Sequence, residues 1–176
     1  MKRLYLLRHA KSEWDAPVSR DFDRPLNRRG HKAARAMARE MRSLGLAFDR
    51  ILASPAARVM ETLEGMAEAW GHDPGAEADE RLYLASAATL LRIVQTAGDA
   101  HESLLLVGHN PGMEQLALLL TREDASRDRL AEKFPTAALV EIELPVAHWA
   151  DVEEGEGTLT RFLRPRDLDP ELGPEE

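Results

Sequence analysis

Short runs of leucine, isoleucine and valine alternate along this 176-residue chain with longer segments whose apolar residues recur at helical spacing. Each short run suits one buried strand, and each longer segment suits a helix that crosses back over a sheet. The alternation therefore predicts the α/β class, with a mostly parallel central sheet covered by crossover helices. The strands of this parallel part are expected at residues 3–8, 50–53 and 103–108.

Four segments predict helices, because each combines an apolar stripe with a start or stop signal. Residues 27–44 are followed by Gly45, and the helix after the second strand starts with Ser54 as its cap and Pro55 as its first residue. The third helix is expected at 86–97, capped by Ser86. Asn110 and Pro111 open the fourth. Residues 72–79 between the second and third helices are expected to form a loop or a short strand.

The alternation breaks down after the fourth helix. Residues 121–135 form a charged insertion, and residues 137–144 and 158–163 predict two late strands joined by a loop. Residues 166–176 are rich in proline and glutamate, so we expect a largely disordered tail. With no repeat or linker dividing the chain, residues 1–165 are expected to form one domain.

Composition excludes several functions. A net charge of −8, with no block of lysine and arginine to offset it, disfavours binding to a nucleic acid. The absence of cysteine excludes disulfides, thiolate catalysis and cysteine-based metal sites. No stretch is long enough to span a membrane, and the apolar run at the N-terminus is too short for a signal peptide. We therefore expect a cytoplasmic protein without a membrane or nucleic-acid partner.

Polar and cationic residues follow the predicted strands, at the point where each strand ends. Arg8 and His9 end the first strand, Ser54 follows the second, and His109 follows the third. Arg58 lies one helical turn after Ser54. Because ligands of open parallel sheets bind beyond the carboxyl ends of the strands, these side chains should converge. Arginine pairs bidentately with phosphate oxygens, and helix N-termini favour anions, so a phosphoryl group is the expected ligand.

Each of these residues also has a plainer interpretation. A single histidine after a strand is more often a loop or capping residue than a catalyst, and a strand-ending arginine is usually a surface charge. Ser54-Pro55 and Asn110-Pro111 are explained as helix starts without any function. The functional interpretation gains weight because the cationic residues occur at the ends of separate strands. They are not scattered over helix faces.

Four blocks of sequence resemble those of the histidine phosphatase superfamily, in the same order and with similar spacing over residues 1–165. The blocks are residues 8–15 (RHAKSEWD), 25–30 (PLNRRG), 54–58 (SPAAR) with Glu61 and Thr62, and 108–111 (GHNP). The resemblance implies a three-layer α/β/α fold of the phosphoglycerate mutase-like type. It is closest to the SixA-type phosphohistidine phosphatases.

The resemblance also implies roles for the strand-end residues. His9 would attack phosphorus and carry the phosphoryl group, while Arg8, Arg58 and a protonated His109 would hold its oxygens. Ser12 and Asn27 would lie near this pocket. A neutral imidazole is a competent nucleophile, and fixed cations can stabilise the charge that spreads over the phosphoryl oxygens. We therefore expect no metal ion or other cofactor.

Two positions depart from the family pattern. Ala10 stands where the family usually has glycine, which disfavours any conformation with a positive φ. Leu84 stands where the mutase and broad-specificity branches carry an acidic proton donor for the leaving alcohol. Glu80, Asp15, Glu13 and Asp23 are alternative donors, although each is more often a solvated surface charge. The missing acid favours a substrate with a P–N bond, because imidazole leaves more readily than an alkoxide.

The leading hypothesis is a metal-independent phosphatase that removes phosphate from a phosphohistidine on a protein partner, such as a histidine phosphotransfer domain. The short chain leaves little room for insertions that would enclose a small substrate. The enzyme alternative is a phosphatase of small phosphate esters, and a mutase is disfavoured by size and by Leu84. A non-catalytic phosphate-binding scaffold is the alternative from another class. Chance motif matches in a generic α/β domain are a further alternative. The sequence does not indicate an oligomeric state or whether residues 121–135 form a lid.

Overall fold

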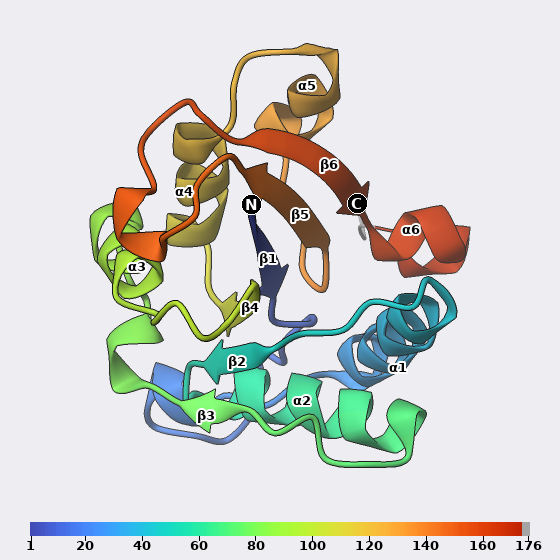
Figure 1. Ribbon diagram of the computed structural model, residues 1–176. Helices are drawn as coiled ribbons and strands as arrows, with labels where there is room; N and C mark the ends of the chain where they lie inside the picture. Colours follow the sequence, from blue (N-terminus) through green and yellow to red (C-terminus); the bar gives the residue numbers. More distant parts are fainter. Residues whose placement is uncertain (174–176) are drawn as a thin grey trace.

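The computed structural model describes residues 1–173 and contains one six-stranded sheet with the strand order β3-β2-β4-β1-β5-β6 (Figure 1). Strands β1, β4 and β2 pair in parallel, and β3 pairs in parallel with β2. Strand β5 runs antiparallel to β1, and β6 runs antiparallel to β5. The strands are β1 (Lys2–Arg8), β2 (Arg50–Ala53), β3 (Glu77–Ala78), β4 (Ser103–Gly108), β5 (Leu139–Leu144) and β6 (Thr158–Leu163). The predicted α/β class is confirmed.

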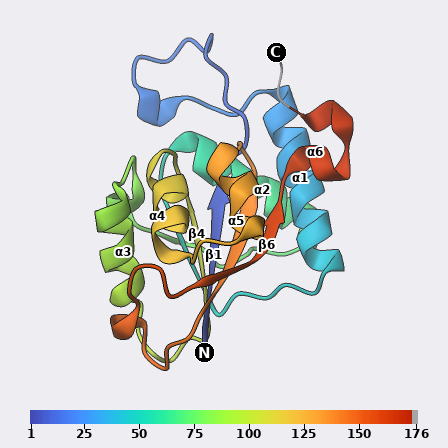
Figure 2. The same ribbon diagram turned by 90° about the horizontal axis from the view of Figure 1, so that it is seen from above.

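Helices cover both faces of the sheet, which gives three layers (Figure 2). Helices α1 (Arg28–Ser43) and α2 (Ala57–Trp70) pack against one face, and α3 (Ala87–Gln95) and α4 (Gly112–Leu120) pack against the other. Alternate residues of β1 belong to separate cores, with Tyr5 and Leu7 packing towards α1 and α2, and Leu4 and Leu6 towards α3 and α4. This alternation follows from the period of two in a strand.

Helices α2 and α4 begin later than predicted. Helix α2 begins at Ala57, because the Ser54 hydroxyl accepts from the backbone N–H of Ala56 and pairs with His109 before the helix starts. Helix α4 begins at Gly112, with Pro111 as its N-cap. The other predicted boundaries lie within two residues of those observed, which is the usual uncertainty at helix and strand ends.

The charged insertion at 121–135 contains a helix. Helix α5 (Ala125–Glu132) begins at Asp124, whose side chain accepts hydrogen bonds from the backbone N–H groups of Ser126 and Arg127. Leu130 and Phe134 are fully buried in the core on the α4 side of the sheet. Two apolar anchors therefore fix a segment whose composition is otherwise that of a surface loop.

The C-terminal segment differs from the predicted disordered tail over the residues that the structure describes. Helix α6 (Pro165–Leu168) and a 3-10 turn (Pro170–Leu172) pack beside α1. Leu168 and Leu172 contact the apolar core under α1, and the Asp167 carboxylate accepts from the backbone N–H of Arg164. These contacts order a segment that composition alone marks as polar. Residues 174–176 of the predicted tail lie outside the described residues.

The loop between β1 and α1 is closed at its base. Ser12 pairs with Leu26, the backbone N–H of Glu13 donates to the carbonyl of Pro25, and that of Asn27 donates to the carbonyl of Lys11. A Cβ at Gly30 would lie 2.0 Å from the Lys11 carbonyl oxygen, so only glycine allows α1 this close to the loop. Figure 2 places this loop (blue) and the C-terminal segment at the end of the molecule opposite the N-terminus.

Candidate active site

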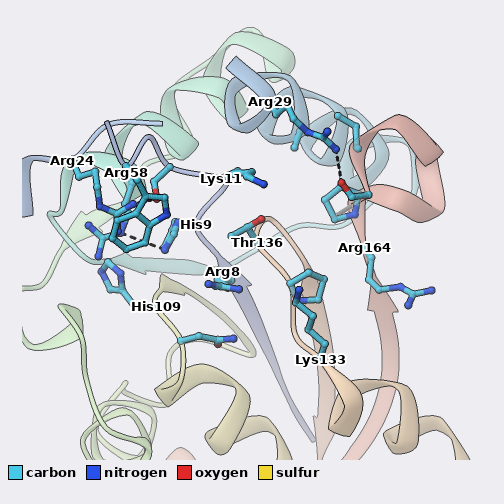
Figure 3. Close-up of a pocket in the computed structure, with 18 of the residues that line it drawn as sticks. Arg8, His9, Lys11, Arg24, Arg29, Arg58, His109, Lys133, Thr136 and Arg164 are labelled. Atoms are coloured by element: carbon cyan, nitrogen blue, oxygen red, sulfur yellow. Dashed lines mark hydrogen bonds between the residues drawn. The ribbon is translucent and has the colours of Figure 1, made fainter. Parts of the chain in front are cut away.

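A pocket of about 540 Å³ opens at the carboxyl ends of β1, β2 and β4 (Figure 3). The residues predicted from the sequence to be catalytic, Arg8, His9, Arg58 and His109, all line it. Basic side chains dominate the remaining lining, and Asp21 is the one carboxylate among the described lining residues. The other basic lining residues are Lys11, Arg24, Arg29, Lys133, Arg164 and Arg166. The pocket is therefore strongly positive in a chain whose net charge is −8.

His9 is buried with its Nε2 atom facing Arg58. Its Nδ1 lies 2.7 Å from the carbonyl oxygen of Ala10, and because a carbonyl only accepts, Nδ1 carries the proton. The lone pair is therefore on Nε2, 3.3 Å from Nε of Arg58. Burial lowers the pKa of His9 well below its usual value, although the bond to Ala10 opposes this. The ring is neutral and competent as a nucleophile at neutral pH.

Arg58 is held by the loop that follows β1. It lies in the first turn of α2, and its side chain is 3% exposed. One terminal nitrogen donates to the backbone carbonyl of Asp21 at 2.9 Å, and the other to the Asp21 carboxylate at 3.0 Å. The Thr62 hydroxyl donates to the Arg58 carbonyl and accepts from the Ala10 N–H, which links α2 to the residue after His9. The guanidinium is thus fixed beside the imidazole.

His109 follows β4, and its ring centroid lies 5.3 Å from that of His9. Its Nε2 is 2.8 Å from the Ser54 hydroxyl, which already accepts from Ala56 and is therefore free to donate to that nitrogen. This leaves the proton on Nδ1, a buried atom with no hydrogen-bond partner in residues 1–173. The expectation of a protonated His109 differs from the structure, because burial and then the charge of Arg58 lower its pKa to about 4.

Arg8 ends β1 and points into the pocket (Figure 3). One terminal nitrogen donates to the carbonyl of Phe134 at 3.2 Å, while Nε is buried without a partner in the described part of the chain. Burial lowers the pKa of Arg8, but an arginine remains charged at neutral pH. Nε of Arg8 and Nδ1 of His109 are therefore two buried donors that the oxygens of an anion could satisfy.

Asp21, Arg24 and Tyr83 complete this part of the site and were missed by sequence reasoning. The Asp21 carboxylate accepts from Arg58, from Arg24 at 3.1 Å and from the Tyr83 hydroxyl at 2.7 Å. Its partial burial would raise its pKa, but the bonds from Tyr83 and Arg58 outweigh this and lower the pKa to about 2. The only signal in the sequence is that Asp21 and Arg24 lie shortly before Pro25. Such a segment is typical of an ordinary solvated loop.

Ser12 and Asn27 have different places. The Ser12 hydroxyl lines the pocket, is buried and accepts from Arg24, whose guanidinium also lies 3.6 Å from the centre of the Trp14 ring. Asn27 does not line the pocket, and its side chain accepts from the backbone N–H of Gly30 as the N-cap of α1. Asn27 therefore lies next to lining residues without lining the pocket itself, because helix capping uses its side chain.

The position of the expected proton donor is apolar. Leu84 lines the pocket with 55% of its surface exposed and a left-handed φ of 49°. None of the alternative donors named from the sequence, Glu80, Asp15, Glu13 and Asp23, lines the pocket. Ala10 is fully buried and is not among the residues with positive φ, so the alanine in place of glycine fits its backbone.

This arrangement can bind a phosphoryl group and attack it. The guanidinium groups of Arg8 and Arg58 and the Nδ1–H of His109 line the same pocket as the His9 imidazole. Fixed donors of this kind can stabilise charge on phosphoryl oxygens. Within residues 1–173 no three histidine, aspartate or glutamate side chains form a cluster that could hold a metal ion. In the same residues no helix has the length and apolar character needed to cross a membrane.

Comparison with known proteins agrees with this geometry. The model of the histidine phosphatase superfamily (branch 1) matches residues 4–83. An uncharacterized protein of Mycobacterium tuberculosis is 37% identical over 164 residues, covering 91% of this chain and all of that protein. The crystal structure of the candidate phosphohistidine phosphatase SixA of Agrobacterium tumefaciens is 34% identical, with a TM-score of 0.78 over 93% of this chain and 98% of that one. The candidate SixA of Nakamurella multipartitia is 25% identical, with a TM-score of 0.80 over 93% and 96%.

The chain therefore belongs to the histidine phosphatase superfamily, and the superfamily and the structural neighbours support a phosphatase enzyme. Within that superfamily it is of the SixA type, since the SixA structures match it over nearly its whole length. The four sequence blocks thus indicated the correct family.

Proposed function

We propose that this phosphatase removes phosphate from phosphohistidine on a protein, through a phosphorylated intermediate on His9. The observation that carries the choice of substrate is the lack of an acidic proton donor among the described residues that line the pocket. Leu84 lines the position expected for the acid, and Asp21, the one carboxylate among the described lining residues, has a pKa of about 2. An ionised Asp21 has no proton to give at neutral pH, so alkoxide leaving groups would depart slowly.

In the first step, Nε2 of neutral His9 attacks phosphorus and the bond from phosphorus to the substrate's imidazole nitrogen breaks. The electron pair of that bond stays on the leaving imidazole, which takes a proton from solvent. Arg8 and Arg58 stabilise the negative charge on the phosphoryl oxygens, and Nδ1 of neutral His109 donates a hydrogen bond to one of them. A dianionic phosphoryl group next to His109 would also raise the pKa of this ring and favour its protonation.

In the second step, water attacks the phosphorus carried by His9. The P–N bond to His9 breaks, its electron pair returns to Nε2, and inorganic phosphate leaves. The hydrogen bond from Nδ1 to the Ala10 carbonyl persists through both steps and keeps the lone pair on Nε2 facing the anion site. Splitting the displacement into two steps lets the same cations serve each of them.

A second candidate substrate is a small phosphate ester, and the size of the pocket favours it. A volume of about 540 Å³ exceeds the needs of a single phosphoryl group and lies in the range of small-molecule sites. A phosphohistidine side chain presented by a protein would fill only the inner part of this space. The two candidates differ in leaving group, so turnover distinguishes them.

The test compares kcat/KM for a phosphohistidine-containing phosphotransfer domain with values for a panel of alkyl phosphate monoesters. We expect the phosphoprotein to be preferred by at least about 10²-fold, the lower range of the benefit from general acid catalysis. The His9→Ala variant serves as the control for contaminating phosphatases. Alkyl esters turned over as fast as the phosphoprotein would reject the phosphohistidine proposal in favour of the small-ester candidate.

A further inference from the structure

Two large apolar side chains that line the pocket are exposed to solvent. Trp14 lies in the loop between β1 and α1 with 77% of its surface exposed, and Leu84 lies shortly before α3 with 55% exposed. A single exposed apolar residue is common on a protein surface and needs no explanation. Two of them on one pocket are available for contact with whatever enters it. We call Trp14 and Leu84 the apolar rim.

A chain of contacts through Asp21 connects the two rim residues. The guanidinium of Arg24 lies 3.6 Å from the centre of the Trp14 ring, and it donates to the Asp21 carboxylate at 3.1 Å. The hydroxyl of Tyr83, the residue before Leu84, donates to the other oxygen of the same carboxylate at 2.7 Å. Trp14 and Leu84 therefore lie on the same side of the pocket, around Asp21.

The Trp14 ring is held in place before any ligand arrives. It packs on Arg24, which is buried and fixed by its bonds to Ser12 and Asp21. Stacking on a fixed guanidinium favours one orientation of the ring, and an aromatic side chain that is already ordered loses little further freedom when a partner covers it. In Figure 3 Arg24 lies at the same end of the pocket as His9, so the rim is near the nucleophile.

Leu84 is held exposed by a strained backbone. Its φ of 49° lies in the left-handed region, which a leucine rarely adopts. The residues on both sides fix this conformation. Tyr83 is bonded to Asp21, and Ala85 packs so closely on α4 that a Cβ at Gly112 would lie 1.9 Å from its carbonyl oxygen. Neither the strain nor the exposure stabilises the free protein, so we expect the benefit to come when a ligand covers the side chain.

The position of the rim favours a protein over a small molecule as the ligand that covers it. A ligand enclosed in the pocket would touch only the parts of Trp14 and Leu84 that face inward, and more than half of each residue's surface faces solvent. The covering ligand must therefore extend beyond the pocket. The buried donors of Arg8 and His109 require an anionic group on the same ligand. Pocket and rim together complement a phosphorylated side chain with apolar neighbours on a protein surface.

We propose that the apolar rim is a docking surface for the phosphoprotein, and that it contacts apolar side chains next to the phosphohistidine. The proposal rests on the proposed function in placing the phosphohistidine beside His9, and it adds how the partner is recognised. The charge of the pocket attracts the phosphoryl group of any partner, whereas the rim selects partners by the residues around that group.

Binding of peptides to the intact protein tests the rim without turnover. Calorimetry would compare two peptides with the same stable phosphohistidine analogue, one with leucine and one with serine at the flanking positions. We expect the leucine peptide to bind about tenfold more tightly, as an aromatic hot spot would give. Trp14→Ala should abolish most of this gain and Leu84→Ala part of it, because each removes one apolar contact. The serine peptide should change by less than about threefold in both variants.

The matched control is Leu44→Ala, which shortens an exposed apolar residue that does not line the pocket. It should retain the full preference for the leucine peptide. Equal affinity for the two peptides, or a preference that survives in Trp14→Ala, would overturn the proposal.

Two other occupants of the rim are also tested. A loss of affinity for phenylphosphonate in Trp14→Ala as large as that for the leucine peptide would assign the rim to small aromatic substrates and overturn the proposal. A dimer that dissociates in Trp14→Ala, measured by sedimentation, would assign the rim to a second copy of the chain and overturn it as well. Slow turnover of phosphohistidine would count against the proposed function and leave the peptide affinities unchanged, so the two failures are distinguishable.

Discussion

The inner and outer parts of the pocket are built in different ways. In the inner part, His9, Arg58 and His109 are buried and bonded to neighbouring segments. The outer part is the region lined by Lys133 and Thr136, where Lys133 is exposed and its position comes from loop backbone. Side chains fixed by burial suit bond-breaking chemistry, which requires accurate geometry, whereas exposed cations on loops suit recognition, which tolerates variation. We therefore expect the bond-breaking steps to depend mainly on the inner part, and contacts with the remainder of the substrate to involve the outer part.

The largest expected effect comes from removing the nucleophile in the inner part. His9→Ala should lower turnover by roughly 10³-fold or more, because the covalent step is lost. Binding of vanadate should persist, since Arg8, Arg58 and His109 keep the anion site. The intact protein should carry acid-labile, base-stable phosphate after mixing with a phosphodonor, and the variant should carry none. A variant with near-normal hydrolysis would contradict the assignment.

Leu84 lines the pocket, and replacing it tests whether the site lacks an acid. The unmodified protein should hydrolyse p-nitrophenyl phosphate far faster than alkyl esters, which have leaving groups of high pKa. Leu84→Glu should speed the alkyl esters by roughly 10²–10⁴-fold if the new carboxyl is well placed, and leave phosphohistidine nearly unaffected. Leu84→Gln is the matched control. A flat dependence on leaving-group pKa in the unmodified protein would mean that another group already donates the proton.

Replacing Asp21 tests how strongly the loop between β1 and α1 contributes to catalysis, through its contacts with Arg58. Asp21→Asn removes the ion pair with Arg58 and keeps the backbone carbonyl to which Arg58 also donates. We expect kcat/KM to fall by about 10- to 100-fold, with most of the loss in kcat, because the guanidinium is displaced from the reacting group. Asp15→Asn, on an exposed residue of the same loop that does not line the pocket, is the control. Unchanged kinetics would mean that the carbonyl alone positions Arg58.

The buried histidines of the inner part should make stability depend on pH. The pKa of His109 is about 4 in the folded protein and near 6.5 in an unfolded chain. The unfolded state therefore binds more protons below pH 6.5, so stability is complete above that pH and is lost as the pH falls towards 4. Urea unfolding at a series of pH values should show that the free energy of unfolding falls less towards low pH in His109→Gln than in the unmodified protein. The expected difference is about 3 kcal/mol. The exposed His72→Gln should have little effect, and equal pH slopes in all three proteins would contradict the prediction.

The inner part was predictable from the sequence, whereas the rest of the site was not. Arg8, His9 and His109 follow buried strands whose apolar runs are plain, and parallel strands bring their carboxyl ends to one edge. Asp21 and Arg24 lie in a loop without periodicity, and their role depends on how the loop folds over Arg58. Lys133 lies in a charged segment that composition marks as surface, and only Leu130 and Phe134 show why it is ordered.

Some elements of the fold could likewise be predicted from the sequence, and others could not. Strands β2, β4 and β6 have their predicted bounds, because buried runs are marked clearly at both ends. The order of residues 165–173 was not predictable, since it depends on Leu168 and Leu172 meeting the core under α1. Asn27 shows that a family resemblance can assign a residue to a site when local capping already accounts for its side chain.

Because the loop between β1 and α1 is closed at its base, its sequence and length can vary without disturbing the elements on either side. Its two ends are already paired, so the loop can change length or composition without moving His9 or the start of α1. Chain-closure entropy makes such changes inexpensive, with a doubling of loop length costing only about 0.6 kcal/mol. Related phosphatases could therefore evolve new substrate preferences by exchanging this loop, provided that each version still presents an anchor for Arg58.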